Sequence, residues 1–371
     1  MNASNAKMLD RSIDGRRPRV MVVGPAFDGA GGIAVVMKTL ARSTLGDRYE
    51  LVNVVTHRES GRGPKALQAL TGISRAAWLL GTRRVDVVYL FASSGFSLRR
   101  KAVVAACSRL ARRPYVVHIH ASNFDGYYRG ALAAERWLVR TTLSEAALVI
   151  AVSPTWERRL QALAPCHTTA IPNPVEIPPQ PATADALSPR IVSLGRLGER
   201  KGSRTVVRAL ALLAGRHPRV RLVLAGDGDL TSVQQEARRL GVDDRVELPG
   251  WIGPAERART LKTASVFTLP SRDEGLPVAL LEAMSYGLPA VVTPVGGIPD
   301  AFEEGRHGYL VAPDDPRALA ERLGDLLDNP GEARKMGLQA RADAEARYAT
   351  EIVAAQVGDA LDSVLRAARS P

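Results

Sequence analysis

The strongest constraint on the fold is a repeated alternation of short apolar runs with helical patterns. The first run, residues 19–24, is rich in valine and precedes a glycine-rich turn and a helix-like stretch. Short β-branched runs followed by helices predict a parallel sheet covered by helices on both faces. Further runs occupy residues 51–55, 85–91, 115–120 and 147–152 in a first series, and residues 190–194, 220–225, 246–248, 266–269 and 290–293 in a second.

A proline-rich stretch over residues 171–181 separates the two series and predicts a linker. A chain of 371 residues also exceeds the size at which one core keeps growing. We therefore predict an α/β protein of two Rossmann-like, doubly wound domains facing a central cleft. The expected order is a disordered lead-in over residues 1–18, a first domain over 19–180, a second over 181–350, and a helix over 351–371 that packs back toward the first domain.

The positive charge of the chain is unevenly distributed. The formal net charge is +12, and residues 1–185 hold 25 Lys and Arg against 13 Asp and Glu, whereas residues 186–371 hold 25 of each kind. The whole excess therefore lies in the first half. Such an asymmetry indicates that one domain faces an anionic partner, which can be lipid headgroups, nucleic acid or a phosphorylated substrate.

Composition also bears on the compartment. No apolar run approaches the ~18 to 20 residues of a membrane span, and the first 18 residues lack the apolar stretch of a secretory signal. Two cysteines, Cys107 and Cys166, are too few and too far apart for a disulfide framework or a close pair of metal ligands. We expect a cytoplasmic protein.

The segment over residues 270–289 carries the strongest functional signal. It follows a predicted strand, and a helix is expected to start within Gly275, Leu276, Pro277 and Val278, because proline is accepted in a first helical turn. Unpaired backbone N–H groups and the helix dipole there form a site for a phosphate or pyrophosphate. Glu274 and Glu282 flank that site and can accept hydrogen bonds from sugar hydroxyls.

A structural interpretation of the same residues stays open at this point. Glu274 can simply cap the helix, and Glu282 can be a solvated side chain on its face. Two basic side chains, Arg196 and Lys201, lie in the run over residues 193–202. They suit a charged leaving group, because a guanidinium fork and an ammonium group both bind phosphate well. They can equally be two ordinary surface bases.

Several blocks in fixed order resemble the retaining glycosyltransferases of the GT-B fold, family 4. Glu274 and Glu282 match the E-x7-E signature of that family, together with its flanking Ser271, Gly287 and Pro289. The run over residues 293–300 is similar to the downstream turn, and Arg196 and Lys201 match the G-R-x5-K-G turn. The resemblance extends from about residue 20 to about residue 313.

The resemblance implies a role for each matched position. Arg196 and Lys201 would neutralise the donor diphosphate, Glu282 would bind the ribose, and Glu274 would hold hydroxyls of the transferred sugar. The nucleotide base would lie near Gly226, Trp251 and Ile252, although tight turns at strand ends explain those residues equally well. The glycine-rich loop with Gly31 and Gly32 would let the backbone approach the donor.

Two histidines fall at alternating positions of the predicted strand over residues 115–120. From this alternation we expect the two side chains to point to opposite faces of the sheet, so that only one of them faces the ligand. His120 is the better match to the family's histidine because it is last in the strand, with a purely structural histidine as the alternative. The other, His118, is interpreted as structural. Asn123 and Asp125 follow and are assigned to the acceptor side. This pattern does not favour a metal site, which needs two or three convergent ligands.

The basic first half contains two amphipathic patches, at residues 98–113 and 78–84. We expect them to dock on an anionic membrane surface, which would make the protein peripheral on the cytoplasmic face of the inner membrane. The alternative is an ordinary solvated helix packed on the sheet. Nucleic-acid binding is disfavoured, because aromatic residues make up only 5% of the chain and no recognisable module appears.

The predicted activity is transfer of a sugar from a nucleoside diphosphate sugar to a hydroxyl of a glycan or polyprenyl-diphosphate-linked glycan, in bacterial surface or exopolysaccharide assembly. The resemblance implies retention of anomeric configuration without an essential metal, and no cofactor besides the donor. A sugar-nucleotide epimerase or a phosphorylase of the same architecture is the alternative within this fold. A basic protein that binds nucleic acid or membranes is the alternative of another class.

Overall fold

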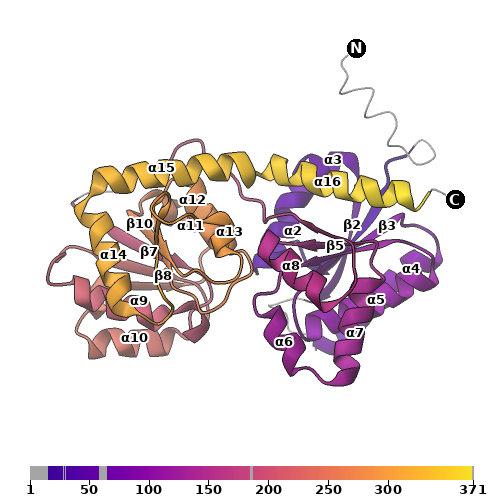
Figure 1. Ribbon diagram of the computed structural model, residues 1–371, viewed down its shortest axis with the longest axis horizontal. Helices are drawn as coiled ribbons and strands as arrows, with labels where there is room; N and C mark the ends of the chain where they lie inside the picture. The colour runs from indigo at the N-terminus through magenta and orange to yellow at the C-terminus, as the bar shows by residue number, and fades with distance from the viewer. Residues whose placement is uncertain (1–15, 28, 30, 58–64, 184–186, 370–371) are drawn as a thin grey trace, which may run out of the picture. The chain divides into compact units, whose positions relative to one another are not determined.

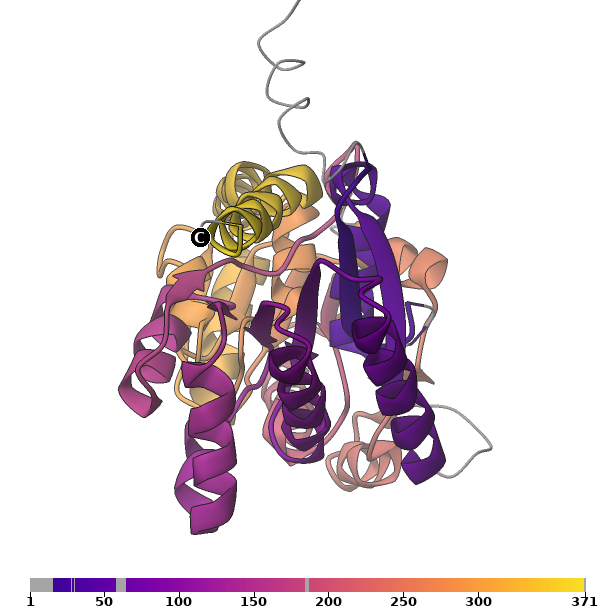
Figure 2. The same cartoon turned by 90° about the vertical axis from the view of Figure 1, so that its right-hand side faces the viewer.

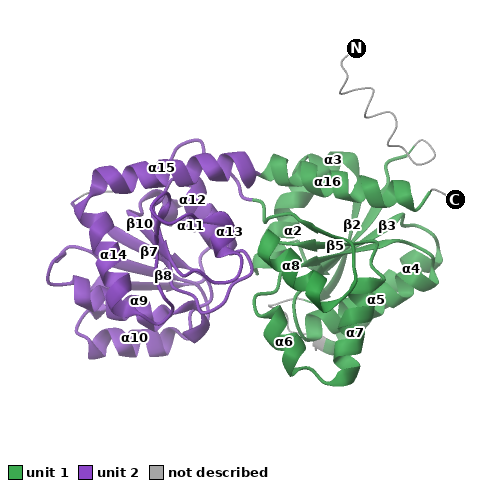
Figure 3. Cartoon of the chain, viewed as in Figure 1, with its two compact units in different colours: residues 1–174, 350–371 green, residues 175–349 purple. Residues whose placement is uncertain are grey.

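The computed structural model describes residues 16–27, 29, 31–57, 65–183 and 187–369 (Figure 1). It divides into two compact units. Unit 1 comprises residues 1–174 and 350–371, and unit 2 comprises residues 175–349 (Figure 3). The predicted domain boundary was after residue 180. The predicted disordered lead-in covers residues 1–18, and most of these lie outside the described part. The structure divides the chain at Pro174, within the proline-rich stretch.

Unit 1 is built on a six-stranded parallel sheet with the strand order β2-β1-β3-β4-β5-β6. The central strands are fully buried, because helices cover both faces, and this explains their continuous apolar sequences. The elements are β1 (Arg19–Pro25), α2 (Gly32–Arg42), α3 (Thr44–Arg48), β2 (Glu50–His57), α4 (Lys65–Gly81), β3 (Val87–Ala92), α5 (Phe96–Leu110), β4 (Tyr115–Ile119), α6 (Phe124–Gly130), α7 (Ala133–Ser144), β5 (Leu148–Ala151), α8 (Pro154–Leu163), β6 (Thr168–Ala170) and α16 (Thr350–Ala367).

Helix α16 belongs to unit 1 although it follows unit 2 in the sequence. It packs against α3 and α2, and a buried polar cluster marks this contact. Arg48 on α3 donates to Asp362 at 2.8 Å, and the Tyr49 hydroxyl lies within hydrogen-bonding distance of Asp362 and of the Gly358 carbonyl oxygen. The helix is therefore fixed by specific bonds as well as by its apolar face.

Unit 2 contains a second six-stranded parallel sheet, with the order β12-β11-β10-β7-β8-β9. One apolar core, formed mainly by α9, α14 and the strands β7, β8 and β10, holds it together. The elements are β7 (Arg190–Leu194), a 3-10 turn (Glu199–Lys201), α9 (Ser203–Leu213), β8 (Arg221–Ala225), α10 (Leu230–Arg239), a second 3-10 turn (Asp243–Arg245), β9 (Val246–Gly250), α11 (Pro254–Lys262), β10 (Val266–Leu269), α12 (Val278–Ser285), β11 (Ala290–Val292), α13 (Ile298–Ala301), β12 (Gly308–Leu310), α14 (Pro316–Asp328) and α15 (Pro330–Arg347).

Each sheet has a topological switch point, where successive strands change from being added on one side of the first strand to being added on its other side. In unit 1 this point lies between β1 and β3, and in unit 2 it lies between β7 and β10. The loops that leave the carboxyl ends of such a strand pair diverge, and ligands of open α/β sheets bind there. No helix in the described part of the chain is long and apolar enough to cross a membrane.

Candidate active site

The predicted residues of unit 2 gather at the carboxyl ends of β7 and β10. The chain leaves β7 through Gly195 and reaches Lys201 in the following 3-10 turn, and it leaves β10 through Pro270 toward Glu274. Gly202, with φ +67°, packs so closely on this second loop that an added Cβ would lie 2.3 Å from the Pro270 carbonyl oxygen. The two loops thus touch at the switch point of the sheet.

Lys201 and Glu274 form an ion pair, with Nζ 2.5 Å from Oε1. Only 5% of Glu274 is exposed, and Ser271 donates its hydroxyl to the same Oε1 at 2.6 Å. Arg200, which the sequence analysis did not single out, approaches the other carboxylate oxygen at 3.9 Å and donates to the Asp273 carbonyl oxygen. Two cations from one loop therefore face one buried carboxylate on the other, an arrangement suited to an anionic ligand with hydroxyl groups.

A third loop fixes the backbone beside Glu274. Gly297 donates its N–H to the Gly275 carbonyl oxygen at 2.7 Å, and the Thr293 hydroxyl donates to the Ser271 carbonyl oxygen at 2.5 Å. Gly296, with φ +58°, approaches so closely that a Cβ there would lie 1.7 Å from the Glu274 carbonyl oxygen. The turn over residues 293–300 therefore packs directly on the signature segment.

Helix α12 begins at Val278, the last of the four residues in which its start was expected. Pro277 is the N-cap residue rather than part of the first turn, which corrects that detail of the prediction. Leu276 is 5% exposed and the helix is apolar. Its first turn adjoins the loop that holds Glu274, so its N–H groups and the carboxylate belong to one short stretch of chain.

Glu282 lies in α12 and pairs with Arg257 of α11. Its carboxylate is largely buried, and this burial raises the pKa of Glu282, while Arg257 acts in the opposite direction. Sequence reasoning missed Arg257, because no pattern links it to the signature segment. Glu282 is therefore neither a freely solvated side chain nor part of the Lys201–Glu274 pair.

Arg196 does not join that pair. Its side chain is 73% exposed, and its nearest acidic group is Asp227, at 3.9 Å. It lies beside Gly228, since a Cβ on that glycine would be 3.1 Å from the Arg196 Cγ. Of the predicted residues, the structure brings Lys201 and Glu274 together. Arg196 lies instead beside the loop that follows β8.

The residues predicted to hold the base lie at the ends of β8 and β9. Gly226, with φ +157°, donates its N–H to the Gly250 carbonyl oxygen, and a Cβ there would lie 1.9 Å from the Gly195 carbonyl oxygen. Trp251 is 57% exposed, whereas Ile252 is buried. These loops therefore adjoin the β7 loop, and the exposed indole can stack on a ligand.

In unit 1, the predicted glycines open helix α2 at the carboxyl end of β1. Gly31 is the N-cap and Gly32 the first residue of the helix. A Cβ at Gly32 would meet nothing within 4 Å, so this position has open space around it. Because β1 flanks the switch point of its sheet, the loop occupies the usual ligand position of an open α/β sheet.

The two histidines lie together, and the expectation that they point to opposite faces of the sheet is wrong. Their ring centroids are 4.0 Å apart, because residues two apart in a strand share a face. His118 is buried and its Nδ1 lies 2.8 Å from the Tyr89 hydroxyl. His120 follows β4 and stacks on Phe91, and its backbone N–H donates to Ala92 at the end of β3.

Both imidazoles are neutral at physiological pH. Burial lowers the pKa of His120 to about 3, although an interaction of its ring with the side-chain oxygen of Asn173, which favours the protonated form, acts in the opposite direction. The pKa of His118 is lowered well below its usual value by burial, with His120 as a smaller cause. His120 can therefore orient or accept a hydrogen bond, but it does not supply a positive charge.

Asn123 and Asp125 have local partners. Asn123 is the N-cap of α6, and its Oδ1 accepts a hydrogen bond from the Gly126 N–H at 3.0 Å. Asp125 lies 3.5 Å from Arg159 of α8. Asn123 therefore caps α6, and Asp125 links α6 to α8. In the described residues, no group of three or more His, Cys, Asp or Glu side chains is arranged to hold a metal ion.

Two parallel α/β units of this kind define the GT-B fold. The structure resembles sucrose-phosphate synthase from Thermosynechococcus elongatus, with a TM-score of 0.79 and 19% identity over 95% of this chain and 100% of that chain. It also resembles HepE of Anabaena in complex with UDP, with a TM-score of 0.75 and 19% identity over 93% of this chain and 100% of that one. The prediction of the fold is confirmed.

Sequence comparison identifies the family. Residues 188–329 match the family described as "Glycosyl transferases group 1", and residues 14–174 match "Glycosyl transferase 4-like domain". The putative colanic acid biosynthesis glycosyltransferase WcaL of Escherichia coli is 34% identical over 188 residues, which are 47% of this chain and 46% of that protein. The chain spans less than half the length of the first curated relatives it matches. It belongs to the group 1, family 4 glycosyltransferases.

Proposed function

We propose that this protein transfers a sugar from a nucleoside diphosphate sugar to a hydroxyl of a glycan or lipid-linked glycan acceptor in polysaccharide assembly. The observation that carries the proposal is the Lys201–Glu274 pair at the switch point of the second sheet. The related HepE structure holds UDP, and the similar WcaL is named for colanic acid biosynthesis. Both support a sugar nucleotide and a polysaccharide product.

The reaction proceeds on one face of the sugar in this proposal. The bond between the anomeric carbon and the diphosphate oxygen breaks, a bond to the acceptor oxygen forms, and the acceptor proton goes to the leaving phosphate. Lys201, Arg196 and the first turn of α12 stabilise the charge that develops on the diphosphate. No protein nucleophile is assigned, and the configuration of the sugar is retained.

The remaining residues position the substrates. Glu274, held by Lys201 and Ser271, accepts hydrogen bonds from hydroxyls of the transferred sugar. Glu282 binds the ribose, which requires that it exchange or share its Arg257 partner. His120 lines the acceptor side as a neutral imidazole. No metal or further cofactor takes part in this scheme.

Donor binding is expected to raise the melting temperature of the protein. A ligand that binds only the folded state stabilises it by about 2.7 kcal/mol at 100 times its Kd. Thermal-shift measurements with uridine, guanosine and adenosine diphosphate sugars should therefore show a shift with one of the three. No shift with any of them would contradict the proposed donor class, and product analysis with labelled donor would separate a transferase from an epimerase or a phosphorylase.

A second observation favours docking of unit 1 on an anionic membrane. Helices α4, α5 and α7 lie side by side over the sheet (Figure 2). These helices and the residues beside them, called here the basic apolar region, carry exposed large apolar side chains and exposed arginines: Leu67, Leu70, Trp78, Phe96, Leu110, Leu132 and Trp137 with Arg83, Arg84, Arg109, Arg112, Arg136 and Arg140.

Two arginines of these helices have acidic partners: Arg99, which lies over the Phe96 ring, donates to Glu135, and Arg109 lies 3.5 Å from Glu145. Arg84 lies over the ring of Trp78, 4.8 Å from its centroid. Such pairs suit an interface in which the rings enter the headgroup region and the cations meet lipid phosphates. Lys101, counted among the surface charges from the sequence, is instead buried and donates to the Thr56 hydroxyl at 3.2 Å.

The double variant Arg136→Ala/Arg140→Ala is expected to weaken binding to anionic vesicles by ~30-fold, because each arginine near such a surface contributes about 1 kcal/mol. Co-sedimentation with phosphatidylglycerol vesicles at two salt concentrations measures this. Arg238→Ala/Arg317→Ala in unit 2 is the matched control and should bind as the wild type does. Equal binding of the wild type to neutral phosphatidylcholine vesicles would contradict the electrostatic docking.

A further inference from the structure

Glu282, the residue proposed to bind the ribose, has a single side-chain partner among the described residues. Arg257 donates from Nη2 to the Glu282 Oε2, and the two side chains are 30% and 20% exposed. In the described part of the chain this is the only side-chain hydrogen bond of either residue, and Oε1 of Glu282 accepts none. One carboxylate oxygen is therefore held by the protein, while the other can accept a hydrogen bond from a ligand.

Arg257 links the two halves of the proposed nucleoside site. It lies near the start of α11, where its backbone N–H donates to the Gly253 carbonyl oxygen. The loop before this helix carries Trp251 and Ile252, the residues predicted to hold the base, and Glu282 lies on α12. The pair thus joins the helix after the base loop to the helix with the ribose carboxylate. The buried Nε of Arg257 has no acceptor among the described residues, so the guanidinium is not engaged elsewhere.

The surroundings of Glu282 make its ionisation depend on Arg257. Burial raises the pKa of Glu282, Arg257 lowers it, and the negative charge of Glu176, at the start of unit 2, raises it again. The neighbouring Tyr286 hydroxyl stays protonated, because burial raises its pKa as well. Without Arg257, the two remaining influences would both favour the protonated carboxyl group.

No neighbouring element supplies a second cation to Glu282 in the described part of the chain. Helix α15 packs on α12, but its Arg341 donates to a backbone carbonyl oxygen in the last turn of α12. Strand β10 has no titratable side chain. The other charged residues of α11, Glu256, Arg259 and Lys262, are exposed. Arg257 is thus the cation on which this carboxylate depends.

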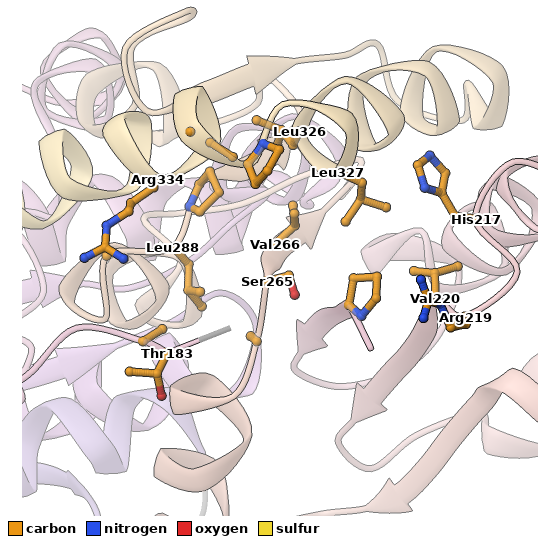
Figure 4. Close-up of a pocket in the computed structure, with 18 of the residues that line it drawn as sticks. Thr183, His217, Arg219, Val220, Ser265, Val266, Leu288, Leu326, Leu327 and Arg334 are labelled. Carbon is orange, nitrogen blue, oxygen red and sulfur yellow. The ribbon is translucent and has the colours of Figure 1, made fainter. Parts of the chain in front are cut away.

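The pair lies outside a cavity that unit 2 contains. Residues that precede or begin several strands line this cavity of about 700 Å³, and Figure 4 shows Val266 and Leu288 at its wall. Neither Arg257 nor Glu282 is among the lining residues. A nucleotide whose binding depends on the pair is therefore not a ligand of this cavity.

We infer that Arg257 is a positioning residue for the nucleotide, which holds one oxygen of the Glu282 carboxylate and leaves the other for the ribose hydroxyls. The inference rests on the proposed function, in which Glu282 binds the ribose of a sugar nucleotide. Ribose hydroxyls donate to a carboxylate, and hydrogen bonds to the ionised form are stronger than those to a neutral group. Arg257 acts through Glu282 and needs no contact of its own with the ligand.

Calorimetric titration of the full chain with nucleoside diphosphates tests this inference. UDP, GDP and ADP are titrated first, and the tightest of them is compared with its dideoxy analogue, which lacks both ribose hydroxyls. The wild type should bind the ribose form at least ~10-fold more tightly, because hydrogen bonds to a charged group are strong. Both ligands carry the same diphosphate, so the ratio of their affinities reports the hydroxyls alone.

Arg257→Gln should lose most of this preference at about pH 6 and regain it at about pH 9, where Glu282 ionises without the arginine. Arg257→Lys keeps a positive charge and should retain most of the preference at both pH values. Arg259→Gln, at an exposed position of the same helix, is the matched control and should behave as the wild type does. Each ratio is measured on one folded population, so a partial loss of folding does not change it.

The outcomes separate this inference from the proposed function. An unchanged preference in Arg257→Gln, or a loss that neither the higher pH nor lysine restores, would overturn the inference and leave the ribose assignment of Glu282 standing. Equal binding of the nucleotide and its analogue by the wild type would contradict that assignment, and the inference with it. Binding of none of the three nucleotides would contradict the proposed donor class, and again the inference with it.

Discussion

Replacing Lys201 by methionine is expected to lower kcat/KM for sugar transfer by about 100- to 1,000-fold, the usual cost of removing one group that stabilises developing charge. The ammonium lies 2.5 Å from Glu274 and next to Gly195 at the end of β7, so its removal takes positive charge from the expected diphosphate position. Steady-state transfer with the donor identified by thermal shift measures this. Lys335→Met, at an exposed pair on α15, is the matched control and should keep wild-type activity.

A second variant separates catalysis from folding. Lys201→Met removes the closest cation from the buried Glu274 carboxylate and leaves it Arg200 at 3.9 Å and the Ser271 hydroxyl, which destabilises the protein by itself. Lys201→Met/Glu274→Gln removes both charges and should recover most of the melting temperature without recovering transfer. If the double variant recovers activity together with stability, the pair is a structural ion pair, and the proposed catalytic role is wrong.

Asp362→Ala is expected to destabilise unit 1 by about 3 kcal/mol, the lower end of the cost of breaking a buried ion pair. The change removes the 2.8 Å partner of Arg48 and a partner of the buried Tyr49 hydroxyl. We expect the loss of stability to be at the lower end because Arg48 still pairs with Asp359, at 3.2 Å, in this variant. Hydrogen exchange followed by mass spectrometry should show faster exchange in α3 and α16, with little change in unit 2.

Asp359→Ala provides the comparison for that result. The Asp359 side chain is 73% exposed, and exposed pairs contribute only about 0 to 1 kcal/mol. Its exchange pattern should resemble that of the wild type. Equal acceleration by Asp359→Ala and Asp362→Ala would show that the buried cluster does not hold α16 in place.

The alternation of apolar runs and helices was sufficient to predict the α/β class and ten of the strands, including the three-residue β11, which is fully buried and therefore apolar throughout. The edge strands β6 and β12 were missed. Each has three residues, one strand neighbour and only partial burial, so neither produces a recognisable apolar run. Short edge strands depend on the tertiary pairing that forms them.

The site was predictable where residues lie in one continuous motif, and unpredictable where partners come from distant segments. Glu274 and Lys201 were named through the family resemblance, but sequence spacing says nothing of their 2.5 Å contact across 73 positions. Arg257, the partner of Glu282, carries no motif at all. Lys101 was assigned to the surface because a helix with basic residues on several sides does not reveal which of them faces the core.

The assignment of α16 to unit 1 has a consequence for the order of folding. The chain enters unit 2 at Val175 and leaves it at Ala349, and these two residues form an isolated parallel bridge. Unit 2 is thus one uninterrupted stretch closed at its own ends, whereas unit 1 is split by 175 intervening residues. During synthesis, which proceeds from the amino terminus, unit 2 has all its strands and helices before unit 1 receives α16. The earlier-made unit is therefore the later one to become complete.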